Sequence, residues 1–158
     1  MCLNRRVILR LIWPRNYSCT RLMSKVRRLM SNKEEVTMPK PHILVADDEE
    51  GIRESLNLIL GDDYQLSFAE DGEQTLTKLR AGRFDLVLLD IKMPKRDGLD
   101  VLREIKSTGL TTPVLVLTAY QSIELAREAV KLGALDYLPK PFEREQILGA
   151  VQDILAKR

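Results

Sequence analysis

Short apolar runs alternate regularly with segments of helical period from residue 42 to the end of the chain. In the segments between and after these runs, apolar residues recur every three or four positions, as they do along one face of a helix. This alternation predicts a doubly wound α/β fold, in which a five-stranded parallel sheet lies between two layers formed by five helices. The strands are expected at residues 42–46, 64–68, 86–89, 114–117 and 134–138.

The third of these runs, Leu86 to Leu89, is apolar at every position. Such a run is typical of a parallel strand that is buried on both faces. It ends at Asp90, and Pro94 prevents a helix from beginning at once. Asp90 is therefore expected at the carboxyl edge of the sheet, where open α/β folds bind their ligands.

Charge divides the chain into two parts. Residues 1–37 contain nine Lys or Arg and two Glu, whereas residues 38–158 contain sixteen Lys or Arg and twenty-one Asp or Glu. We therefore expect a basic leader, residues 1–38, and one globular domain, residues 39–158. The acidic domain is not expected to bind nucleic acid directly, since it lacks the excess of basic residues that such binding needs.

The leader is open to several interpretations. Its apolar stretch, residues 7–13, is too short to span a bilayer and contains a charge that a signal peptide would lack. A disordered tail or a start codon assigned too far upstream is favoured, because Met23, Met30 and Met38 are alternative starts. An organelle transit peptide and a membrane-surface or partner-binding segment are the other possibilities. Both cysteines lie in the leader, so no disulfide framework is implied and a cytoplasmic location is expected.

Polar side chains stand at the expected strand ends. Asp47 and Asp48 follow the first strand, and Asp90, Thr118 and Lys140 follow the last three. Parallel strands end at one edge of a sheet, so these residues are expected in one crevice. Three carboxylates repel one another unless one is protonated or a cation binds, and all-oxygen ligands favour Mg²⁺. A carboxylate beside a metal, an ammonium and a hydroxyl predicts a phosphoryl-transfer site in which Asp90 accepts phosphate.

The same segments resemble the receiver domain of two-component response regulators. The resemblance covers roughly residues 41–157 and implies the strand order 2-1-3-4-5, as in the chemotaxis member of that family. It also implies a phosphorylation-activated signalling switch that is not an enzyme for other substrates and catalyses only its own phosphorylation and dephosphorylation. The similar segments are residues 45–49, 88–94 with 97–98, 116–119 and 136–142.

The resemblance implies a role for each acidic residue. Asp90 would be the phosphoacceptor, and the donor would be a phosphohistidine on a sensor histidine kinase or a phosphotransfer protein. Asp48 would bind Mg²⁺ directly and Asp47 mainly through water, with the backbone carbonyl of Lys92 as a further ligand. A simpler role, in which Asp47 and Asp48 only cap the helix that follows, remains open.

The last two strand ends would carry the response. By the resemblance, Thr118 and Lys140 contact the phosphoryl oxygens, and Tyr137 swings inward when Thr118 moves. The peptide bond between Lys140 and Pro141 would be cis. Thr118 could instead cap a helix, and Tyr137 could be a static aromatic residue of the core.

Two functions of other classes also remain open. A metal-dependent phosphatase with an Asp nucleophile usually needs a second acid at the same strand end, where Lys92 stands two residues after Asp90. A flavin or nucleotide binder would need a Gly- or Ser/Thr-rich phosphate loop after the first strand, where residues 47–50 are four acids. A receiver that has lost its chemistry is disfavoured because every site residue is present.

Output is expected through a surface formed by the helix over residues 123–132, the strand at 134–138 and the last helix. We expect a separate protein to dock there after phosphorylation, or a second copy of the chain. One helix follows Lys140, so the sequence is not expected to hold a DNA-binding or ATPase segment, and it is either stand-alone or part of a longer regulator. The residues expected to mix small apolar and charged groups on this surface are Ala126, Arg127, Glu128, Ala129, Val130, Lys131 and Glu143.

Overall fold

The computed structural model describes residues 39–119 and 123–157. Five parallel strands form one sheet in the order β2-β1-β3-β4-β5, and a helix follows each strand. The predicted fold class and strand order are confirmed. The elements are β1 (His42–Ala46), α2 (Glu50–Leu60), β2 (Gln65–Ala69), α3 (Gly72–Ala81), β3 (Leu86–Asp90), α4 (Gly98–Thr108), β4 (Val114–Ala119), α5 (Ile123–Leu132), β5 (Asp136–Lys140) and α6 (Arg144–Ala156).

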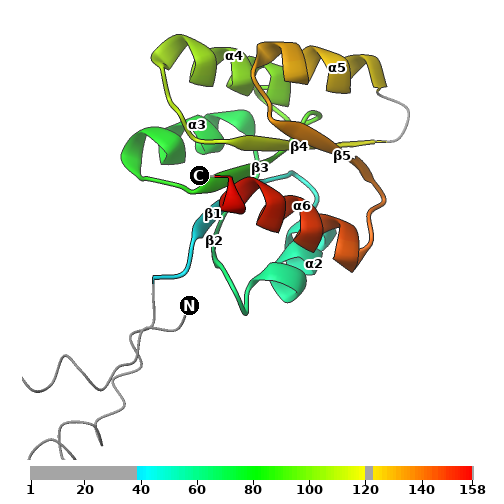
Figure 1. Cartoon of the computed structure of the whole chain (residues 1–158). Helices are drawn as coiled ribbons and strands as arrows, with labels where there is room; N and C mark the ends of the chain where they lie inside the picture. Colours follow the sequence, from blue (N-terminus) through cyan, green and yellow to red (C-terminus); the bar gives the residue numbers. More distant parts are fainter. Residues whose placement is uncertain (1–38, 120–122, 158) are drawn as a thin grey trace, which may run out of the picture. The chain divides into compact units, whose positions relative to one another are not determined.

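Helices cover both faces of the sheet. Figure 1 shows α3, α4 and α5 on one side of the strands and α2 and α6 on the other. Because successive side chains of a strand point to opposite faces, β3 contributes to both layers. Val87 and Leu89 belong to the core cluster with α3, α4 and α5, whereas Leu86 and Leu88 belong to the cluster with α2 and α6. All of β3 is buried, as its unbroken apolar run predicts.

Local sequence fixes where the helices near the carboxyl edge begin. The Asp71 side chain accepts a hydrogen bond from the Gln74 amide and caps α3. The Asp97 side chain accepts one from the Asp100 amide and caps α4 in the same way. Each cap satisfies an amide that the first turn of a helix leaves without a partner, so the loops that precede these helices have defined ends.

Two predictions about the output surface are wrong. The fifth strand is Asp136–Lys140 rather than 134–138, because Ala134 lies in the connection after α5, where its amide donates to the Ala129 carbonyl. Ala126 and Ala129 are fully buried rather than part of an exposed surface. Small side chains at this spacing let α5 lie close to the sheet, so they serve the core of the domain.

The sequence predictions on the leader fall outside the described residues. Within residues 39–119 and 123–157, every helix is too short or too polar to span a bilayer.

Candidate functional site

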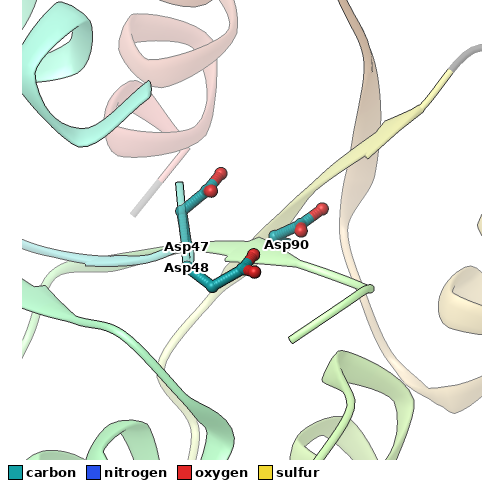
Figure 2. A group of neighbouring side chains, drawn as sticks. All are labelled: Asp47, Asp48 and Asp90. Atoms are coloured by element: carbon teal, nitrogen blue, oxygen red, sulfur yellow. The ribbon is translucent and has the colours of Figure 1, made fainter. Parts of the chain in front are cut away.

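Three carboxyl groups converge at the carboxyl edge of the sheet. Asp47 and Asp48 follow β1, and Asp90 is the last residue of β3, the neighbouring strand. One carboxylate oxygen from each of the three lies within 4.8 Å of the others, and Figure 2 shows the three side chains. Asp47 and Asp90 are buried, whereas Asp48 is exposed. The predicted acidic cluster therefore forms at the end of adjacent strands.

Lys140 reaches this cluster from the end of β5. Its Nζ donates a hydrogen bond of 2.6 Å to Oδ2 of Asp47. It also lies 3.4 Å from Oδ1 of Asp90 and 3.6 Å from Oε1 of Glu49. The peptide bond between Lys140 and Pro141 is cis, as predicted. One ammonium thus neutralises part of the charge of three carboxylates.

Burial and charge act on Asp90 in opposite directions. Burial raises the pKa of the Asp90 carboxyl to about 6, the Lys140 ammonium opposes this rise, and the negative charge of Asp47 adds to it. Burial by itself lowers the pKa of Lys140, but the hydrogen bond to Asp47 and the neighbouring carboxylates leave it above its ordinary value. Lys140 is therefore a permanent cation, and Asp90 holds its negative charge at a free-energy cost.

A cavity of about 250 Å³ opens beside the cluster. Thr118, which is buried at the end of β4, lines it together with Lys92, whose side chain is exposed. Tyr137 lies elsewhere: its partner in the sheet register is Val116, and 42% of its surface is exposed. The residues that line the cavity are Asp48, Glu49, Asp90, Ile91, Lys92, Thr118 and Lys140.

Two residues at this edge were not predicted to take part. Glu49 lines the cavity, and its amide donates to Oδ1 of Asp47 at 3.0 Å. Nη1 of Arg53 donates to the Asp47 carbonyl oxygen at 2.7 Å. The run of acids after the first strand points to Glu49, but nothing in the sequence marks Arg53, which lies near the start of α2, close to the end of β1. The cap of α2 is Glu49 and makes no side-chain hydrogen bond, so Asp47 and Asp48 do not cap this helix.

The donor set fits a hard divalent cation. The carboxylate oxygens of Asp47, Asp48 and Asp90 are close enough to share one ion, and the cavity gives access to them. Mg²⁺ prefers oxygen ligands and keeps several waters, which suits a site that is open on one side.

Comparison with known proteins agrees with this geometry. The family described as "Response regulator receiver domain" matches residues 43–152. Response regulator MprA of Mycolicibacterium vanbaalenii is 42% identical over 116 residues, which cover 73% of this chain and 50% of that protein. The chain thus spans about half the length of the curated relatives it matches.

Solved structures give the same result. The receiver domain of the Francisella response regulator 1452 has a TM-score of 0.70 and 29% identity, and the match covers 75% of this chain and 98% of that one. Chemotaxis protein CheY4 of Vibrio cholerae has a TM-score of 0.68 and 31% identity, with 73% and 98% covered.

Proposed function

Because this chain belongs to the family of response regulator receiver domains, we propose that Asp90 is the residue through which it acts as a phosphorylation-dependent signalling switch. The position of Asp90 supports this proposal most directly. It is the carboxylate at the end of the central strand, it lines a cavity, and the carboxylates of Asp47 and Asp48 and the Lys140 ammonium lie beside it. The family assignment favours this function over the phosphatase and the flavin or nucleotide binder.

The proposed reaction moves one phosphoryl group. A carboxylate oxygen of Asp90 attacks the phosphorus of a phosphohistidine on a sensor histidine kinase or a phosphotransfer protein. The new O–P bond forms as the N–P bond breaks, and the leaving imidazole nitrogen keeps the electron pair. Lys140, 3.4 Å from Asp90, offsets the charge that arrives with the phosphoryl group, and the Thr118 hydroxyl donates to one of its oxygens. The domain would catalyse only this transfer and the later hydrolysis.

The acidic cluster would hold Mg²⁺. Asp47, Asp48, Asp90 and the backbone carbonyl of Lys92 are the proposed ligands, and the bound ion would supply positive charge against the phosphoryl oxygens. Phosphorylation and Mg²⁺ binding are general features of the family. In this chain the proposal is supported by the distance between the carboxylates and by the all-oxygen donor set.

Output would leave through the face formed by α5, β5 and α6. Thr118 and Tyr137 are the proposed switch residues, which shift the populations of two states when Asp90 is phosphorylated. In the described part of the chain, three of the four exposed large hydrophobic residues lie on α5, on β5 or in the connection between them, namely Val130, Tyr137 and Leu135. We favour a separate protein over a second copy as the partner.

We also place the protein in the cytoplasm, because residues 38–158 contain no cysteine that would call for an oxidising compartment.

One experiment tests the phosphoacceptor. The full chain and Asp90→Asn are incubated with a small phosphodonor and Mg²⁺, and their intact masses are compared. We expect one phosphoryl group on the native chain, none on Asp90→Asn, and none on either when EDTA is present. Labelling of Asp90→Asn, or labelling that EDTA leaves undiminished, would refute the proposal.

A second experiment tests the coupling to the output face. In the Thr118→Ala variant, phosphorylation should change the affinity for the partner, or for a second copy, less than it does in the native chain. If both proteins respond equally to a stable phosphoryl mimic in sedimentation, Thr118 does not carry the signal.

A further inference from the structure

An unusual turn lies in the loop that joins β3 to α4, residues 91–97. Lys95 has a φ of 62° and is the only residue other than glycine with a positive φ in the described part of the chain. The Arg96 amide donates to the Pro94 carbonyl at 2.7 Å across it. A hydrogen bond between residues two apart, with a positive φ at the central one, defines a γ-turn of the rare and strained kind. Something must hold Lys95 in this conformation.

An ion pair joins Lys95 to the neighbouring loop between β2 and α3. Nζ of Lys95 lies 2.6 Å from Oδ2 of Asp71. Asp71 is buried and rigid, since its other carboxylate oxygen accepts from the Gln74 amide at the start of α3. The hydrogen bond from Lys95 lowers the pKa of Asp71, with the Gln74 amide as the next cause, so the carboxylate is charged at neutral pH.

Close packing brings the two loops together beside this ion pair. A Cβ at Gly72 would lie 2.4 Å from the carbonyl oxygen of Arg96, so only glycine permits the approach. Arg96 pairs with Glu104 of α4, which also pairs with Arg80 of α3. Ion pairs therefore connect the turn to both α3 and α4.

The same loop carries a residue of the proposed site. At its far end the Gly98 amide donates to the Ile91 carbonyl at 2.7 Å, and a Cβ at Gly98 would lie only 2.3 Å from the carbonyl oxygen of Asp90. Lys92 lies between this attachment and the ion pair at Lys95. The path of the backbone at Lys92 is thus constrained from both sides.

We infer that the Lys95–Asp71 ion pair positions the β3–α4 loop so that the Lys92 backbone carbonyl lies where it can bind the cation. Asp71 and Lys95 are then positioning residues for the phosphoryl-transfer site, although neither touches it. This inference rests on the proposed function, which makes that carbonyl a ligand.

Two conservative variants remove the ion pair without removing the local structure. Asp71→Asn keeps a good helix cap and loses the charge. Lys95→Asn keeps a residue that tolerates positive φ and loses the ammonium. We expect calorimetric titration to show that each variant binds Mg²⁺ about two- to fivefold more weakly than the native full chain, the range for one partly exposed ion pair. The double variant should bind no more weakly than the worse single variant, because both remove the same interaction.

A second measurement does not depend on the metal. In EDTA, hydrogen exchange of the Gly98 amide should be faster in both variants, since that amide closes the loop. Lys95→Arg should restore the native values of both measurements. Arg103→Gln is the matched control: it breaks surface ion pairs with Asp100 and Glu128 and should change neither measurement.

The results separate this inference from the proposed function. If the native chain binds Mg²⁺ and is phosphorylated, but both variants keep its affinity within about 1.3-fold, the positioning role is wrong and the function stands. Equal weakening in Arg103→Gln would overturn it too, because the effect would then be a general one of surface charge. If the native chain binds no Mg²⁺, the proposed site fails and this inference fails with it.

Discussion

Replacing Asp90 by asparagine should make the protein more stable at neutral pH. The carboxyl has a pKa of about 6 in the folded protein, against an ordinary value of 3.8, chiefly because it is buried. The folded state therefore holds the proton more tightly than the unfolded state does. The stabilisation that protonated Asp90 gives the folded state is fully present below about pH 4 and is lost as the pH rises through about 6.

The size of the effect follows from that difference. The folded and unfolded pKa values of Asp90 differ by about two pH units, and each unit corresponds to about 1.4 kcal/mol. Ionised Asp90 thus costs the folded state roughly 3 kcal/mol above pH 7 when no cation is bound. Only 8% of the side chain is exposed, so solvent screens little of this cost. Asparagine resembles the protonated aspartic acid in shape and charge and avoids the cost.

Urea unfolding in EDTA, repeated between pH 4 and pH 8, measures the effect. We expect Asp90→Asn to exceed the native chain by about 2–3 kcal/mol in free energy of unfolding at pH 7.5, and by almost nothing at pH 4. Asp153→Asn is the control, because Asp153 is an exposed aspartate on α6 and should show no such divergence. A difference that stays constant with pH, or an asparagine variant that is less stable at pH 7.5, would contradict the reasoning.

Three further predictions concern the same edge of the sheet. Lys140→Met should lower the free energy of unfolding in EDTA by about 2–4 kcal/mol, because it leaves fully buried Asp47 without its ammonium; a change below about 0.5 kcal/mol would argue against it. Gly98→Ala should lower the free energy of unfolding by about 2–4 kcal/mol, because the new Cβ meets rigid backbone. The control, Gly149→Ala on α6, meets nothing within 4 Å and should raise it by about 0.5–1 kcal/mol. Equal effects of the two substitutions in urea unfolding would speak against the close contact at Gly98. Millimolar Mg²⁺ should raise the melting temperature of the native chain more than that of Asp90→Asn, and calorimetry that shows equal shifts would place the ion elsewhere.

The sheet and its acidic edge could be predicted because each depends on a local signal. An apolar run that is unbroken over Leu86–Leu89 has few alternatives to a buried strand. Once the strands are parallel, Asp47, Asp90 and Lys140 must lie at the same edge, and the strand order implied by the resemblance places their strands near enough for contact. The topology thus carries most of the information about the site.

The wrong predictions concern segments whose sequence pattern fits two different structures. Ala134 and Leu135 look like the start of a strand, but Ala134 fills the end of the core from a connection, and Leu135 is exposed. The strand continues instead through Pro139, whose missing amide proton an edge strand tolerates. The alanines of α5 could equally be an exposed contact surface or a close contact with the sheet, and only the packed structure decides.

The ion pair between Lys95 and Asp71 could not have been predicted from the sequence. These residues are 24 positions apart in two loops, and neither lies in a periodic pattern. The ion pair forms because the two loops pack closely, with Gly72 against the backbone of Arg96.

The route from the site to the exposed edge is short because it runs within two paired strands. Thr118 and Ala119 of β4 pair with Pro139 and Lys140 of β5, so the two groups proposed to contact the phosphoryl oxygens belong to one hydrogen-bonded ladder. Tyr137 belongs to the same ladder and is 42% exposed on the edge strand. A shift of Thr118 and Lys140 toward a phosphoryl group would therefore act on the same pair of strands that carries Tyr137, so the signal would need to cross no other element of the sheet.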